Sequence, residues 1–211
     1  MTLLVGLTGG IASGKSTACR FFRELGAHIV DADQVSRDLV KPFSPAWKEI
    51  VEAFGPEILE ENNEIDRAKL ADIIFSHAEK RGILEGIIHP GIADEISRRV
   101  EDLKRRDPDG VIIVDAALMI EVGRHEDYER LLVVYTDEET QARRLMERDL
   151  LGKAEAYSRI EAQMPLAGKI EYADYIIDNN GSSENTRKEV ERVFLELLKL
   201  VADQGSNGVS P

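Results

Sequence analysis

Residues 9–16, Gly-Gly-Ile-Ala-Ser-Gly-Lys-Ser, form the pattern with the clearest chemistry in this chain. Glycines at this spacing let backbone N–H groups turn inward around phosphate oxygens, which makes the segment a phosphate-binding loop, or P-loop. Lys15 can reach the β- and γ-phosphates of ATP, and the Ser16 hydroxyl can bind Mg²⁺. The residues expected to bind the nucleotide are Gly9, Gly10, Ile11, Ala12, Ser13, Gly14, Lys15, Ser16 and Thr17.

The residues on either side of this loop predict a strand before it and a helix after it. Residues 3–8 are apolar and rich in β-formers, as in a buried strand. One helical face after the loop is apolar, with Ala18, Phe21, Phe22 and Leu25. Because a helix N-terminus favours phosphate, this order supports a phosphate site over the alternative, a glycine-rich turn without a ligand.

A second predicted strand ends in Asp31-Ala32-Asp33. Ligands of parallel α/β sheets bind beyond the carboxyl ends of the strands. If this strand flanks the P-loop strand, Asp33 lies beside the γ-phosphate and can act as general base for an acceptor hydroxyl. Asp33 can equally be the N-cap of a helix over residues 34–40. Arg37, one turn later, either holds an anionic group of the acceptor or forms a surface ion pair.

Val111–Asp115 consists of four apolar residues followed by an aspartate. In P-loop enzymes such a strand places its carboxylate near Mg²⁺, directly or through water. Asp115 is therefore the second candidate metal-binding residue beside Ser16. Glu121, six residues later, carries less information, and a surface role is as good an interpretation.

Residues 138–169 are rich in arginine and separate two predicted strands. Phosphoryl transfer needs cations around the transferred group and shelter from water, and a mobile lid that carries arginines supplies both. Arg144 and Arg148 lie one turn apart and share a helix face, so they are the candidate lid cations. The alternative is a solvated helix whose arginines pair with Glu147 and Asp149.

The histidines and aromatic residues give weaker signals. The four histidines lack the spacing of metal ligands, which argues against zinc. His89, before Pro90, can bind the acceptor or can be structural. Trp47, with Phe43 and Phe54, indicates a small core, although an apolar substrate groove has the same composition.

Five apolar runs separated by helical patterns predict a parallel sheet with helices on both faces. The strands are expected at residues 3–8, 27–31, 111–115, 131–135 and 175–178. About eighty residues between the second and third strands are too many for a simple crossover. They are punctuated by Pro42, Pro45, Pro56 and Pro90.

This uneven spacing predicts an α/β core that carries two helical insertions. The core comprises residues 1–34, 110–140 and 170–203, with a last helix over about 183–201. A helical lobe is expected at 35–109, and a lid of two helices joined near Gly152 at 141–169. Residues 204–211 are rich in Gly, Ser and Asn and predict a disordered tail.

The bulk properties limit the partners and the compartment. A net charge of −13 argues against a nucleic-acid partner, while a local cluster of cations can still bind an anionic substrate. There is no apolar run of 18 residues and no basic segment before the first apolar run, so neither a membrane span nor a signal peptide is expected. The single Cys19 is compatible with a buried position in a reducing cytoplasm.

With these residues in hand, the chain resembles the dephospho-coenzyme A kinase family. The resemblance covers about residues 4–181 and rests on an ordered set of motifs rather than on the P-loop alone. The segments that carry it are 6–17, 31–33 with Arg37, 87–90, 118–121, 144–149, Arg159 with Gln163, and 173–179. The chain departs from the family pattern at Ala117, where proline is usual, and at Gly152, where serine or threonine is usual.

The resemblance implies a P-loop NTPase-type core, a coenzyme A-binding lobe at 35–109 and a lid at 141–169. It implies transfer of the ATP γ-phosphate to the ribose 3′-hydroxyl of dephospho-coenzyme A, the last step of coenzyme A synthesis. Lys15, Asp33 and Arg144 would be catalytic, Arg148 would contact the nucleotide, and Asp115 would support Mg²⁺ with Ser16. Arg37 and His89 would bind the acceptor with Asp33, and a monomer is plausible.

Two other classes of protein fit parts of the sequence. One is a different small-molecule or nucleoside-monophosphate kinase, because a long insertion after the second strand suits any such acceptor. The other is a nucleotide-dependent switch that hydrolyses ATP slowly. The Asn-Lys-x-Asp motif expected of a G-protein is absent from the sequence. A screen of acceptors for ADP release would separate these classes.

Overall fold

The computed structural model describes residues 1–75 and 77–207 and divides the chain into two compact units. Unit 1 consists of Met1–Asp31 and the chain from Val100 on, and unit 2 is Ala32–Arg99. The sequence places the boundaries of the inserted lobe at 35 and 109. In the structure the second unit boundary falls inside one long helix.

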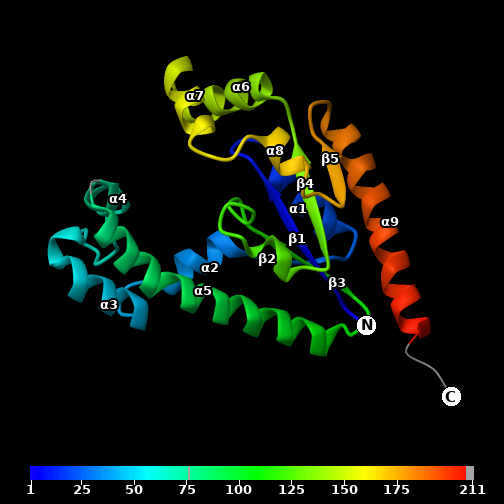
Figure 1. Ribbon diagram of the computed structural model, residues 1–211, viewed down its shortest axis with the longest axis horizontal. Coiled ribbons are helices and arrows are strands. Elements are labelled where there is room, and N and C mark those ends of the chain that lie inside the picture. Colours follow the sequence, from blue (N-terminus) through cyan, green and yellow to red (C-terminus); the bar gives the residue numbers. More distant parts are fainter. Residues whose placement is uncertain (76, 208–211) are drawn as a thin grey trace. The chain divides into compact units, whose positions relative to one another are not determined.

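Unit 1 is built on a five-stranded sheet in which every neighbouring pair is parallel (Figure 1). The strand order is β2-β3-β1-β4-β5. The strands are β1 (Leu3–Gly9), β2 (His28–Asp31), β3 (Val111–Asp115), β4 (Arg130–Tyr135) and β5 (Tyr175–Asp178). The predicted five-stranded parallel sheet is therefore confirmed.

The expectation that the second strand flanks the P-loop strand is wrong. β3 lies between β1 and β2, and Leu7 of β1 is paired with Asp115 of β3. A crossover that skips one strand position leaves room for a strand that enters later in the chain, and sequence order does not reveal this. The carboxylate at the end of the strand next to the P-loop strand is consequently Asp115.

The helices of unit 1 are distributed over both faces of the sheet and its carboxyl end. They are α1 (Lys15–Glu24), α6 (Glu138–Asp149), α7 (Lys153–Glu161), α8 (Leu166–Ile170) and α9 (Ser183–Asn207), together with the end of α5 (Ala78–Arg106). Figure 1 shows α9 running along the β5 side of the sheet and α6 lying beside α7.

The main core of unit 1 lies between one sheet face and helices α1 and α9. Val5 and Leu7 of β1 are fully buried there, against Phe22 of α1 and Val193 of α9. On the opposite face, a Cβ on Gly6 would lie 2.7 Å from the Met119 sulfur, so the segment after β3 packs tightly on β1. Both faces are covered, which explains why the strands are continuous apolar runs.

The C-terminal helix α9 is longer than the sequence indicates, since it continues to Asn207. Residues 204–207 of the predicted disordered tail are therefore helical. The remaining tail residues, 208–211, lie outside the described residues. Across residues 1–75 and 77–207, no helix has the length and apolar character needed to cross a membrane.

Unit 2 is helical and has its own small core. Its helices are α2 (Ala32–Leu39), α3 (Pro45–Phe54), α4 (Arg67–Phe75) and the first part of α5. The centre of the core is formed by Ile50, Phe54, Ile58, Leu70 and Leu84. Trp47 is also buried and donates from its indole N–H to the Asn63 carbonyl at 2.8 Å. The core interpretation is confirmed for Trp47 and Phe54, whereas Phe43 is 64% exposed.

Pro90 does not interrupt the helices of this lobe, contrary to the sequence-based expectation. It lies inside the 29-residue helix α5. A proline in a helix frees the carbonyl four residues earlier, which here belongs to Gly86, an exposed residue with open space around it. The helix is held on its other side because Leu84 and Ile88 pack on the unit 2 core.

Candidate active site

The P-loop connects the end of β1 to the start of α1, and its backbone has two left-handed residues. Gly14, the N-cap of α1, has φ 95°, and Ala12 has φ 56°. The Ser13 N–H donates to the Gly10 carbonyl at 3.1 Å, and the Thr17 N–H donates to the Gly14 carbonyl at 3.0 Å. The loop is thus a closed turn that leads directly into the helix N-terminus, where phosphate is favoured.

Close packing explains why glycine is needed at three positions of the loop. A Cβ on Gly14 would lie 1.9 Å from the amide nitrogen of Asn179, at a φ that already disfavours a side chain. A Cβ on Gly9 would meet the Ser13 hydroxyl at 2.6 Å, and one on Gly10 would meet the Gln141 amide at the same distance. The loop is therefore fixed by its neighbours as well as by its own turn.

Lys15 and Asp115 form an ion pair at the carboxyl end of the sheet. The Lys15 ammonium lies 3.1 Å from Asp115 Oδ1, and the two side chains are only 14% and 12% exposed. Burial raises the pKa of the Asp115 carboxyl, and the charge of Lys15 acts against this shift. The Cys19 thiol donates to Asp115 Oδ2 at 3.4 Å, and burial next to this carboxylate raises the pKa of the thiol.

The residues that could hold Mg²⁺ lie at the start of α1 and at the end of β3. Ser16 is the second residue of α1, and Asp115 is the last residue of β3. Both provide oxygen ligands, and Mg²⁺ typically binds one or two such protein groups together with water and substrate phosphates. The donor set therefore fits this ion. The described part of the chain holds no cluster of three His, Cys, Asp or Glu side chains that could bind a metal without a substrate.

The two candidate lid arginines of α6 have different surroundings. Arg144 Nη2 donates to the Asn179 carbonyl at 2.7 Å, while its Nη1 is buried without a hydrogen-bond partner. Burial lowers the pKa of Arg144, whose charge is therefore incompletely compensated. Arg148 is instead paired with Asp149, with Nε 2.7 Å from Oδ1, and its side chain is 59% exposed.

Arg144 lines a cavity of about 280 Å³ next to the P-loop. All of its lining residues belong to unit 1 and come from α1, α6 and the segment between β5 and α9. They are Gly14, Thr17, Arg20, Arg144, Asn179, Gly181 and Ser183. The cavity thus adjoins the left-handed Gly14 and an arginine with one free N–H group.

Unit 2 carries the three candidate acceptor residues. Asp33 is exposed in the first turn of α2, and because this helix begins at Ala32, Asp33 is not its N-cap. The capping alternative for Asp33 is therefore wrong. Arg37 lies one turn further along the same helix. His89 is exposed on α5 and directly follows Ile88.

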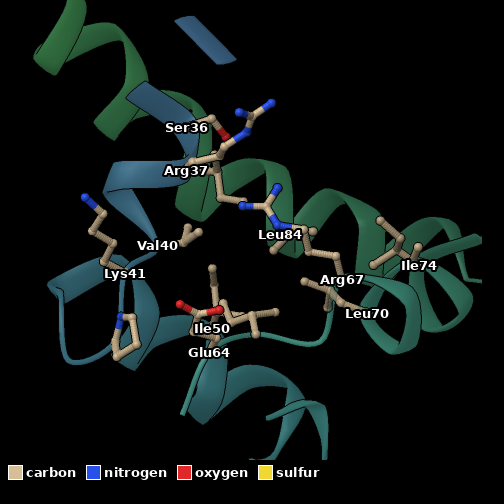
Figure 2. A pocket seen from close by; sticks show the side chains of 14 residues that line it. Ser36, Arg37, Val40, Lys41, Ile50, Glu64, Arg67, Leu70, Ile74 and Leu84 are labelled. Carbon is tan, nitrogen blue, oxygen red and sulfur yellow. The ribbon is translucent and has the colours of Figure 1, made fainter. Parts of the chain in front are cut away.

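A cavity of about 370 Å³ lies within unit 2 (Figure 2). Its apolar wall comes from α3, α4, α5 and the loops before α3 and α4, and includes Val40, Ile50, Ile65, Leu70, Ile74, Leu84 and Ile88. The charged residues Arg37, Lys41, Glu64 and Arg67 also line it. The cavity therefore offers a long apolar surface together with three cations and one carboxylate, and Arg37 is one of its lining residues.

The family model for dephospho-CoA kinase matches residues 3–185. The chain belongs to the dephospho-CoA kinase family. The curated dephospho-CoA kinase of Geobacillus kaustophilus is 47% identical over 190 residues, which cover 90% of this chain and 94% of the relative. Family membership confirms the predicted ATP-dependent kinase of coenzyme A synthesis.

Solved structures agree with this dephospho-CoA kinase assignment. Dephospho-CoA kinase from Campylobacter jejuni superposes with a TM-score of 0.71 at 30% identity, covering 94% of this chain and 98% of that structure. A shikimate kinase from Acinetobacter baumannii reaches a TM-score of 0.54 at 16% identity, with 94% of each chain covered. The latter shows only a shared fold, which is that of P-loop kinases.

Asn179 is a site residue to which the sequence gives no role. Its side-chain amide donates to the Ser13 carbonyl at 2.6 Å, and its Oδ1 accepts from the Thr186 hydroxyl at 2.6 Å. Its backbone carbonyl accepts the bond from Arg144 described above. Its position directly after β5 is a signal that could have identified it, since ligands of parallel sheets bind beyond the carboxyl ends of the strands. In this dephospho-CoA kinase family member, Asn179 connects the P-loop, α6 and α9.

Proposed function

We propose that this chain transfers the γ-phosphoryl group of ATP to the ribose 3′-hydroxyl of dephospho-CoA, which gives CoA and ADP. The observation that carries the proposal is the buried Lys15–Asp115 pair at the end of a complete P-loop, in a chain of the dephospho-CoA kinase family. The pair provides a cation for phosphate and a carboxylate for Mg²⁺ at one place.

The nucleotide is proposed to bind on unit 1, with its phosphates on backbone N–H groups of the loop 9–17 other than those of Ile11, Ser13 and Thr17, which donate within the protein. Lys15 contacts the β- and γ-phosphates, as its place at the start of α1 suits. The cavity beside Gly14 takes the nucleoside, and the free N–H group of Arg144 faces the added negative charge. Arg148 contributes from the same helix after it exchanges its partner Asp149 for the nucleotide.

Ser16 and Asp115 would hold Mg²⁺, Asp115 directly or through water. When bound, the ion neutralises charge on the β- and γ-phosphates and lowers the barrier to transfer. Asp115 is already held in place by Lys15 and by the Cys19 thiol. These contacts orient the carboxylate before the nucleotide arrives, which reduces the reorganisation needed during reaction.

The acceptor is proposed to bind to unit 2, the predicted coenzyme A lobe. Dephospho-CoA combines a long pantetheine arm with a pyrophosphate. The apolar wall of the 370 Å³ cavity suits the arm, and Arg37, Lys41 and Arg67 suit the pyrophosphate. His89 lies next to the lining residue Ile88 and adds a polar contact to the acceptor.

Asp33 is proposed as the general base. Its carboxylate takes the proton of the 3′-hydroxyl while the new O–P bond forms, and the bond between the γ-phosphorus and the β–γ bridging oxygen breaks to release ADP. The carboxylate is exposed, in the first turn of α2, where it can meet an acceptor. Residues 141–169 act as the lid that excludes water from this step, and the cytoplasm is the proposed compartment.

A screen of acceptors tests the proposed activity. Purified chain, ATP and Mg²⁺ are incubated with dephospho-CoA, shikimate or nucleoside monophosphates, and ADP release is measured. Release that depends on dephospho-CoA, with CoA as the product, is expected. The folded variant Lys15→Ala is the control and should lose nearly all turnover, because it lacks the charge that stabilises the transferring phosphoryl group. Equal or faster turnover of another acceptor overturns the proposed substrate.

A further inference from the structure

The peptide groups of Ile11, in the middle of the P-loop, are held from both sides by glutamine side chains. The Ile11 N–H donates to Gln163 Oε1 at 2.7 Å. The Ile11 carbonyl accepts from Gln141 Nε2, also at 2.7 Å. Gln141 belongs to α6, and Gln163 follows α7. We call these two hydrogen bonds the Ile11 clamp.

The chemistry of the backbone fixes which atom of each glutamine faces Ile11. A backbone N–H only donates and a carbonyl only accepts, so Gln163 must present its oxygen and Gln141 must present its NH₂ group. The usual ambiguity between the two ends of an amide side chain is therefore removed at both positions. The two glutamines have the same shape but opposite roles.

Packing ties the same part of the loop to the predicted lid. Ile11 and Ala12 pack against a cluster of α6 and α7 residues that is centred on Leu145 and Ile160. Gln141 itself is 4% exposed. The Gln141 side of the clamp is thus desolvated and the Gln163 side is half-buried, so a lost hydrogen bond leaves a backbone group of the loop without its protein partner.

The segment that carries Gln163 is itself anchored by an ion pair between a buried lysine and a more exposed glutamate. The Met164 N–H donates to Glu121 Oε1 at 3.2 Å, and the same oxygen lies 2.8 Å from the ammonium of Lys169, whose side chain is 0% exposed. Lys169 also donates to the Ala117 carbonyl at 2.7 Å, two residues after Asp115. This pair therefore connects the base of the lid to the strand that ends in Asp115, and Glu121, although exposed, has a structural partner.

We infer that Gln141 and Gln163 are positioning residues that fix the P-loop at Ile11 and couple its conformation to the lid segment 141–163. The inference rests on the proposed phosphate-binding role of the loop. A nucleotide that orders the loop then orders the lid, and by thermodynamic reciprocity a correctly placed lid raises nucleotide affinity. No contact between either glutamine and the nucleotide is needed.

Isosteric substitutions separate this role from simple packing. Gln163→Glu keeps an oxygen acceptor for the Ile11 N–H, whereas Gln163→Met removes it. Gln141→Glu places a carboxylate against the Ile11 carbonyl and loses the donor. The inference therefore predicts that glutamate is tolerated at 163 and harmful at 141, although the change in shape is the same.

Two measurements test whether the Ile11 clamp is intact. Hydrogen exchange of the Ile11 amide, followed by NMR in nucleotide-free protein, should be slow in the wild type and in Gln163→Glu, and faster in Gln163→Met. The Kd for ATP with Mg²⁺, measured by calorimetry, should rise about fivefold or more in Gln163→Met and Gln141→Glu, as expected for one lost hydrogen bond. Gln163→Glu should bind ATP more tightly than Gln141→Glu, because both variants carry the same added charge near the loop and only Gln141→Glu loses a hydrogen bond to Ile11.

The outcomes decide the inference. Equal Kd values for the two glutamate variants, or an Ile11 amide that stays protected in Gln163→Met, would overturn it. A fall in melting temperature with unchanged Ile11 exchange and unchanged Kd would also overturn it, since that marks packing alone. If the wild-type chain bound no ATP while Gln163→Met deprotected Ile11, the proposed function would fail and the clamp would remain.

Discussion

At the scale of single residues, the Lys15–Asp115 pair shows how two opposite charges of the site compensate each other before substrates bind. An isolated carboxylate at 12% exposure would favour protonation, and Lys15 offsets this by supplying the opposite charge at 3.1 Å. A phosphate and a divalent cation can each replace one member of the pair. This exchange keeps both charges compensated, so nucleotide binding leaves no charge of the pair buried without an opposite charge beside it.

The substitution Asp33→Asn tests the proposed base. It preserves the shape and removes the basicity, so kcat for transfer to dephospho-CoA should fall about 10²- to 10⁴-fold. Because Asp33 is exposed and does not cap α2, the melting temperature should change little. The Kd for ATP should also stay the same, since the P-loop holds the phosphates. Calorimetry and ADP release measure the two quantities.

The contrary result is equally informative. Transfer at the wild-type rate in Asp33→Asn would remove this residue from the mechanism, and capping would no longer explain its position. A lower melting temperature with unchanged kcat would instead mark a structural role. Asp38 lies on the same helix, and its carboxylate pairs with Lys41 and Arg99. The variant Asp38→Asn is the matched control, because it removes a carboxylate of α2 that has no proposed role in transfer.

The residues that the sequence could predict are those whose role is set by local order. Lys15 and Ser16 belong to one contiguous loop, and Asp115 ends an apolar strand, so their chemistry can be inferred without the fold. The buried Lys169 and its partner Glu121 are 48 residues apart. Their contact depends on how α8 packs against β4, which no local pattern encodes.

At the scale of elements, α6 shows how one helix separates two arginines that the sequence groups together. Arg144 and Arg148 are one turn apart, yet Arg144 reaches the carbonyl of Asn179 beside the P-loop, and Arg148 turns to the carboxylate of Asp149. Arg159 of α7 shares Asp149 at 3.4 Å. The interpretation as a solvated helix therefore describes Arg148, in the last turn of α6. The interpretation as part of a phosphate site suits Arg144, one turn earlier.

This difference predicts unequal effects of two alanine substitutions. Arg144→Ala should lower kcat by about tenfold to a thousandfold, since it removes a partly desolvated cation from the nucleotide cavity. Arg148→Ala removes an exposed ion pair and should reduce kcat less. Steady-state kinetics with dephospho-CoA and a thermal melt of each variant measure the two effects. Similar losses of activity in both variants would contradict the distinction.

The strands were predictable to within a residue or two because each is apolar on both faces and short. The order of the strands was not, since β3 enters between β1 and β2 only after the whole of unit 2. The prediction that Pro90 interrupts a helix was wrong for a different reason. Its cost to α5 is local, whereas the packing of Leu84 and Ile88 that holds the helix is tertiary.

At the scale of the whole molecule, the two units divide the chemistry. Unit 1 has the phosphate loop and a polar cavity of about 280 Å³, and unit 2 has an apolar cavity of about 370 Å³ with its own core. Each cavity is lined by residues of one unit only. Each of the two proposed ligands therefore has a candidate cavity within a single unit.

Ligand-resolved hydrogen exchange tests this division. ADP with Mg²⁺ should slow exchange in residues 9–17 and, through the Ile11 clamp, in residues 141–163. Dephospho-CoA alone should slow exchange in residues 36–50 and 64–74, the two segments that contain most of the residues lining the unit 2 cavity. At a ligand concentration of about 100 times Kd, binding stabilises the bound unit by about 2.7 kcal/mol. Amides that exchange only when that unit opens should then slow about a hundredfold.

The two ligands provide the control for each other, because each should leave the other unit's core amides nearly unchanged when it is added alone. Ile50 in the unit 2 core and Leu7 in the unit 1 core are fully buried reporters for this comparison. Protection by dephospho-CoA confined to the P-loop would contradict an acceptor site in unit 2. Protection of both cores by either ligand alone would show that the units are stabilised together, so the cavities could not be treated as independent sites.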